Sequence, residues 1–81
     1  MLQICGCPIP ARDAEALVRL LEDDVTLASD EAATAIRYAA EGEHSIDAVD
    51  ADIRDAILHV LADPPSPGLA VLRDALASRR C

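Results

Sequence analysis

Apolar residues recur every three or four positions along most of this chain, the spacing that places them on one face of an α-helix. The clearest run consists of Ile46, Val49, Ile53, Ile57 and Val60. Ser45 or Asp47 can cap the N-terminus of this helix with a side-chain oxygen. Two prolines follow Asp63 and cannot continue it, so we expect the helix to end there.

Three other segments show the same spacing with their own start and stop signals. Ser29 can cap a helix through its hydroxyl, and Gly42 marks where that helix stops. Ser66 followed by Pro67 is typical of a helix N-terminus, because proline fits the first helical turn. The expected helices therefore cover residues 10–23, 29–42, 46–63 and 66–80.

The first nine residues depart from this pattern. Pro8 and Pro10 keep the residues before them out of the helical region, so we expect residues 1–9 to form an extended N-terminal arm. The connections between the helices are short, which favours antiparallel neighbours. We therefore predict an all-α fold, a compact bundle of about four short antiparallel helices that forms a single helical domain over residues 10–81.

Charge narrows the classes of partner. The chain carries a net charge of -8, and residues 20–63 hold twelve acidic residues against Arg37 and Arg54. Such a field repels nucleic-acid phosphates and anionic membranes, so we expect no direct nucleic-acid or membrane binding. No apolar run approaches the roughly 20 residues of a membrane span, and no signal peptide is visible. The expected location is the cytoplasm.

Three cysteines supply the sharpest chemical feature. Cys5 and Cys7 lie one residue apart in the expected arm, and Cys81 ends the sequence. Thiolates select zinc or copper, and a structural zinc site takes four ligands, so His44 or His59 would complete the set in one chain. A dimer could instead contribute two cysteines from each chain. Zinc sites favour two to four residues between paired cysteines, which weighs against this pair.

Two other interpretations of the cysteine pair stay open. Cys5 and Cys7 could act as a redox dithiol, whose bridge across one residue would be strained and labile. The interpretation we favour is that they are small, partly buried residues without chemistry.

We predict that the chain is not an enzyme, because no catalytic constellation is visible. His59 follows Asp55 by four residues, a spacing that predicts a surface pair rather than a catalytic dyad. The acidic residues of this region match no register of a calcium-binding loop.

Apolar residues outside the main stripes indicate a binding role. Leu58 lies nearly opposite the main stripe of its helix, and Val71 lies off the stripe of the last helix. Tyr38 lies at the edge of an apolar face made mostly of alanine. We expect these three side chains to form a contact surface, and the chain to be a small acidic interaction or regulatory module. Its partner would be a second copy, as a homodimer, or a basic protein surface. The alternative function is a thiol-based metal-binding or redox-responsive protein.

Overall fold

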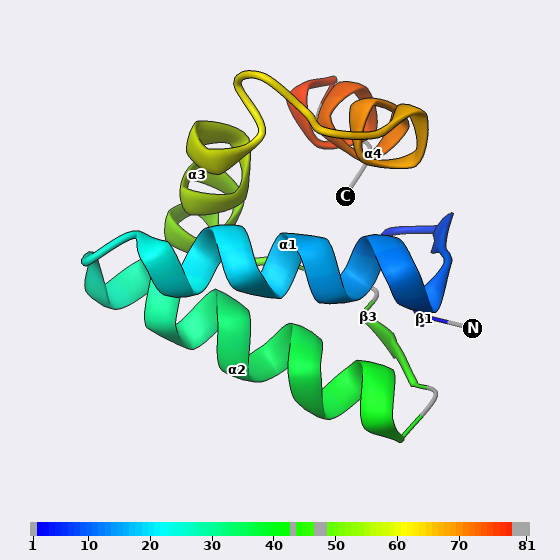
Figure 1. Ribbon diagram of the computed structural model, residues 1–81, viewed down its shortest axis with the longest axis horizontal. Helices are drawn as coiled ribbons and strands as arrows, with labels where there is room; N and C mark the ends of the chain where they lie inside the picture. Colours follow the sequence, from blue (N-terminus) through cyan, green and yellow to red (C-terminus); the bar gives the residue numbers. More distant parts are fainter. Residues whose placement is uncertain (1, 43, 47–48, 79–81) are drawn as a thin grey trace.

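Four helices and three short strands form the part of the chain that the computed structural model describes, which is residues 2–42, 44–46 and 49–78 (Figure 1). In chain order they are β1 (Leu2–Ile4), β2 (Cys7–Ile9), α1 (Ala11–Asp23), α2 (Leu27–Glu41), β3 (Ser45–Ile46), α3 (Ala51–Val60) and α4 (Pro67–Ala77). The molecule is mainly α-helical, as predicted. The small sheet corrects the prediction of a purely helical bundle.

The N-terminal segment is extended and folds back on itself as a hairpin. β1 and β2 pair antiparallel, with Leu2 opposite Ile9 and Ile4 opposite Cys7. Cys5 and Gly6 connect them with φ angles of 52° and 81°, and positive φ at both positions is typical of a type I′ turn. Strand alternation buries the apolar residues of this hairpin and leaves Gln3 and Pro8 exposed, so the expected arm is part of the core.

β3 completes the sheet and shortens the helix that was expected from residue 46. Ser45 and Ile46 pair in parallel with β1, giving the strand order β2-β1-β3. The Cys5 amide also donates a hydrogen bond of 2.6 Å to the Ile46 carbonyl. α3 begins only at Ala51, with Asp50 at the N-cap position. Ser45 is therefore a strand residue and caps no helix, and Asp47 lies outside the described residues.

The other helix boundaries follow local hydrogen bonds. α1 ends at Asp23 and α2 has Gly42 as its C-cap, both as predicted. The N-cap of α2 is Thr26 rather than Ser29, because the Thr26 hydroxyl accepts a hydrogen bond of 3.2 Å from the Ser29 amide. Ser29 itself is buried, with its hydroxyl oxygen 2.7 Å from that of Thr26.

The helices cross at different angles. α1 and α2 lie side by side, α3 stands steeply against the end of α1, and α4 lies on the opposite side of α1 from α2 (Figure 1). The predicted bundle of aligned antiparallel helices therefore does not describe their arrangement. The face that α2 buries consists largely of Ala32, Ala33 and Ala39, whose small side chains let the α1 backbone approach closely.

A polar contact holds α4 against α1. Ser66 caps α4 by accepting a hydrogen bond from the Leu69 amide (3.3 Å), and its hydroxyl donates to Asp13 Oδ1 on α1 (3.0 Å). A side chain at Gly68 would overlap the Asp13 carboxylate. The absence of a side chain at this position therefore permits the contact between α1 and α4.

Across the described residues, no helix has both the length and the apolar character that crossing a bilayer requires.

Candidate functional site

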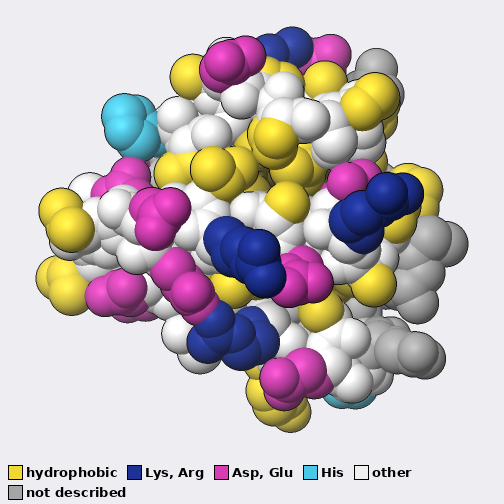
Figure 2. Space-filling model, viewed as in Figure 1, with side chains coloured by type: hydrophobic (Ala, Val, Ile, Leu, Met, Phe, Trp, Pro, Cys, Tyr) yellow, Lys and Arg dark blue, Asp and Glu magenta, His cyan; other side chains and the backbone are white. Residues whose placement is uncertain are grey.

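Four large apolar side chains are exposed in the described part of the chain. Their exposed fractions are 98% for Val25, 83% for Leu27, 71% for Tyr38 and 58% for Val71. Val25 lies in the connection between α1 and α2, and Leu27 is the first residue of α2. Figure 2 shows apolar side chains beside acidic ones at the left end of the molecule, where Figure 1 places this connection. This end of the molecule is thus both apolar and acidic.

Tyr38 and Leu27 share one exposed face of α2. Leu27, Glu31, Thr34 and Tyr38 are spaced by four, three and four residues, so they lie along one side of the helix. Asp30 flanks them, and a shallow hollow of about 460 Å³ runs between Asp30, Glu31, Thr34, Ala35 and Tyr38. We call the set Leu27, Asp30, Glu31, Thr34 and Tyr38 the α2 outer face. Every one of these side chains is exposed.

The acids of the α2 outer face are not neutralised by ion pairs of the described residues. Arg37, the arginine of α2, pairs with Glu22 of α1, and Arg19 pairs with Glu15 at 2.8 Å, as its i,i+4 spacing predicts. Asp30 and Glu31 take part in none of the ion pairs within residues 2–42, 44–46 and 49–78. Their charges are therefore available to a partner.

The ring of Tyr38 has one described aromatic neighbour. His44 stacks on it, with 6.0 Å between ring centroids and 22° between ring planes. His44 follows the end of α2 and is exposed, as expected for a residue in a short connection. This stacking restricts the Tyr38 side chain while leaving most of its surface in solvent.

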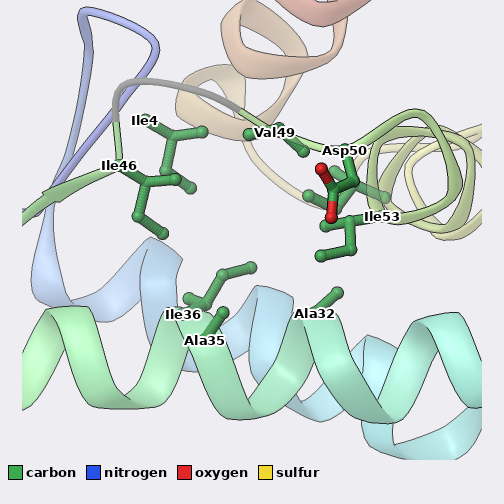
Figure 3. Close-up of a pocket in the computed structure, with 9 residues that line it drawn as sticks. Ile4, Ala32, Ala35, Ile36, Ile46, Val49, Asp50 and Ile53 are labelled. Atoms are coloured by element: carbon green, nitrogen blue, oxygen red, sulfur yellow. The ribbon is translucent and has the colours of Figure 1, made fainter.

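A second hollow lies on the other flank of α2, between this helix, the sheet and α3. It has a volume of about 120 Å³ and is lined by Ile4, Ala32, Ala35, Ile36, Ile46, Val49, Asp50, Ile53 and Ile57. Figure 3 shows side chains of α2 on one side, those of β1 and β3 on another, and Val49, Asp50 and Ile53 on the third. We call this hollow the Asp50 pocket. Its walls are aliphatic apart from the Asp50 carboxylate.

The two N-terminal cysteines differ in bonding state and in burial. Cys5 lies in the turn of the hairpin, where it is partly buried, and it is disulfide-bonded. Cys7 is a buried free thiol in β2, and desolvation by burial raises its pKa. A raised thiol pKa lowers the thiolate fraction, which weakens Cys7 both as a nucleophile and as a metal ligand.

The metal prediction for Cys5, Cys7 and Cys81 gains no support. Cys81 lies outside the described residues. Within those described, no group of three or more histidine, cysteine, aspartate or glutamate side chains is arranged to hold a metal ion.

The described ion-pair partner of His59 differs from the predicted one. Its Nε2 lies 3.8 Å from Asp24 Oδ2, beyond the end of α1, and Asp55 lines the same shallow hollow as these two residues. The pattern of α3 alone could not show this, because the contact joins residues far apart in the sequence. His59 remains 78% exposed, which is consistent with the predicted surface role.

The predicted contact residues lie on three different helices. Tyr38 belongs to α2 and Val71 to α4, and both are exposed. Leu58 belongs to α3, where it is partly buried and packs against the core. Sequence reasoning missed Val25 and Leu27. The signal was present, because Val25 lies between two expected helices and belongs to neither apolar face.

Comparisons of this chain with models of protein families, with curated proteins and with solved structures find no match.

Proposed function

We propose that this chain is a protein-binding module whose α2 outer face binds a partner surface that is both basic and apolar. The observation that carries the proposal is the exposure of Leu27 and Tyr38, at 83% and 71%, on the same helix face as two acids that form no ion pair with the described residues.

The apolar residues of this face would supply the affinity. Burying a large apolar side chain that was exposed contributes roughly 1.5–3 kcal/mol. Tyrosine is enriched among the residues that dominate interface energetics, since its ring gives a large contact at a low cost in side-chain entropy. Tyr38 is already restricted by His44, so binding orders it further at little cost.

The acids of this face would orient the partner and raise the rate of association. Asp30 and Glu31 stand within one turn of Leu27, and Asp23 lies beside Val25 at the same end of the molecule. Complementary charge steers encounter and suppresses partners of the wrong sign. A partner with lysines or arginines around an apolar centre fits this arrangement.

A second copy of the chain fits the same face less well. Each copy carries a net charge of -8, and pairing two α2 outer faces would bring Asp30 and Glu31 of both copies together. We therefore favour a basic partner over the homodimer that the sequence also allowed.

Two labelled amphipathic peptides of about 15 residues would test the proposal, since helices of that length are the shortest that form readily. Both carry leucines at the same helical positions, and the remaining positions are lysines in one and glutamates in the other. Fluorescence anisotropy should show binding of the lysine peptide only. Its affinity should fall as the salt concentration rises from about 50 to about 300 mM, because screening weakens charge attraction.

Variants locate the face that binds. Replacing Leu27 and Tyr38 together by alanine should lower the affinity for the lysine peptide by at least about tenfold, or about 1.4 kcal/mol of binding free energy. Val71→Ala, which removes an exposed apolar side chain from α4, is the matched control and should leave affinity unchanged. Equal binding of the glutamate peptide, or an equal loss in Val71→Ala, would refute the proposal. Sedimentation that shows a dimer abolished by the double variant would assign the face to a second copy instead.

A further inference from the structure

We infer that the Asp50 pocket receives a branched aliphatic side chain of the partner, such as leucine or isoleucine, next to a cationic group that pairs with the Asp50 carboxylate. This inference deepens the proposed function and depends on it. It adds a second contact point on the opposite flank of α2, with a chemistry that the α2 outer face does not have.

The walls of the pocket select an apolar group. Eight of the lining residues are aliphatic, and they come from four elements and the connection before α3. An apolar cavity leaves its lining atoms without contacts on one side, so a hydrocarbon that fills it restores those contacts. Ala32, Ala35 and Ile36 form the α2 wall, and the small side chains of the two alanines leave the space (Figure 3).

Asp50 selects a positive charge beside that apolar group. It holds the N-cap position of α3, yet its side chain accepts no capping hydrogen bond from the described residues. Figure 3 shows its carboxylate directed toward the α2 side of the pocket. Asp50 is also exposed, so its carboxylate is within reach of a bound cation.

Ala35 connects the pocket with the α2 outer face. This exposed residue lines both the Asp50 pocket and the hollow between Asp30 and Tyr38. One partner segment that lies across α2 can therefore reach both places. Both sites also suit the same kind of ligand, an apolar side chain with a basic neighbour.

The volume of the Asp50 pocket limits the size of the apolar group that it can bind. An apolar cavity of about 150 Å³ accommodates benzene. The Asp50 pocket, at about 120 Å³, is smaller and suits a branched group of four carbons. An indole ring is too large for it.

Isobutylammonium is the probe, because it joins such a group to one positive charge, and isobutanol is its neutral match. Methyl NMR of isoleucine-labelled full-length protein gives the readout. Ile4, Ile36, Ile46, Ile53 and Ile57 line the pocket, whereas Ile9 is buried elsewhere and serves as an internal reference. Titration with isobutylammonium should shift the five pocket methyls and leave Ile9 unmoved, with a Kd on the order of 1–10 mM.

Two charge variants test the role of Asp50. Asp50→Asn keeps a residue type that caps helices well. It should lower the affinity for isobutylammonium by about three- to tenfold and leave the affinity for isobutanol unchanged. Asp55→Asn on the exposed side of α3 is the control, because Asp55 does not line the pocket, and it should change neither. Isobutanol binding as tightly as isobutylammonium, or shifts spread equally to Ile9, would overturn the inference.

The probe experiment separates this inference from the proposed function. If isobutylammonium does not bind while the lysine peptide still binds through Leu27 and Tyr38, only the pocket inference fails. If the pocket methyls respond to isobutylammonium but not to the lysine peptide, the pocket is no part of the partner site and the inference is again overturned. Loss of peptide selectivity alone rejects the proposed function.

Discussion

Burial limits what the thiol of Cys7 can do. The side chain points into the core from β2, and its pKa is raised because the charged thiolate loses solvation there. Reaction and metal binding both require the thiolate. Burial therefore favours a role for Cys7 as a small apolar residue of the sheet, whereas Cys5 is disulfide-bonded.

Alkylation of Cys7 should follow this burial. Iodoacetamide should modify Cys7 in the folded, non-reduced protein at least about tenfold more slowly than in urea, because buried structural cysteines are inert. The raised pKa also displaces the pH profile. The rate for the unfolded chain should level off above its ordinary thiol pKa of about 8.5, while that of the folded protein should still rise. Peptide mass spectrometry of the Cys7 segment measures both rates. Equal rates at neutral pH would contradict the burial.

At the scale of elements, a glycine determines how closely α4 approaches α1. Gly68 lies in the first turn of α4, where a side chain would meet the Asp13 carboxylate. That carboxylate accepts a hydrogen bond from Ser66, the N-cap of α4. The helix start and the helix contact therefore depend on the same three residues.

A double-mutant cycle should show this dependence. Gly68→Ala alone should lower the free energy of unfolding by about 1 kcal/mol, because the added methyl displaces Asp13 and breaks its charged hydrogen bond. In an Asp13→Ala background the same change should be neutral or stabilising by up to about 1 kcal/mol, since alanine has a higher helix propensity than glycine. Urea unfolding measures all four proteins. The same destabilisation in both backgrounds would mean that Asp13 is not the neighbour that matters.

Helices were predictable from the sequence where their signals are local. The caps Ser66 and Gly42 and the end of α1 act within one turn, and the structure has them as expected. The start of α3 was not predictable in this way. Ile46 has helical spacing relative to Ile53, yet it pairs with a strand that lies more than forty residues earlier. Periodicity reports which residues are buried, and both conformations bury Ile46 against the same core.

The candidate site was predictable only in part. Tyr38 stood out because its helix offers little other bulk, and it is exposed. Leu58 was expected at the surface but packs against the core, because an apolar position off the main stripe can still face a neighbouring element. The Asp50 pocket could not be predicted, since its lining comes from segments that are brought together by the tertiary fold.

At the scale of the whole molecule, acidic side chains outnumber basic ones and the described arginine ion pairs lie in solvent. The net charge is -8, and the described pairs of Arg19 and Arg37 are more than half exposed on the arginine side, where such pairs contribute little. Asp24, Asp52 and Asp55 line one shallow hollow together with His59. The folded state concentrates these charges more than the unfolded chain does.

Salt should therefore stabilise the protein. Raising sodium chloride from about 20 to about 200 mM at neutral pH should increase the free energy of unfolding by about 0.5 kcal/mol, as screening weakens the repulsion between acids. Urea unfolding at each salt concentration measures the change. The Asp52→Asn and Asp55→Asn double variant should show a smaller increase. A fall in stability with salt would show instead that the exposed ion pairs dominate.

The pairing of β1 with β3 also constrains the order in which the chain can fold. The hairpin of β1 and β2 joins neighbours and can close as soon as it is made, whereas Gln3 meets Ser45 only after both α1 and α2 have been synthesised. Closing that long loop is entropically costly unless the two helices have already packed. We therefore expect the β1–β2 hairpin to form early in folding and β3 to pair with it late.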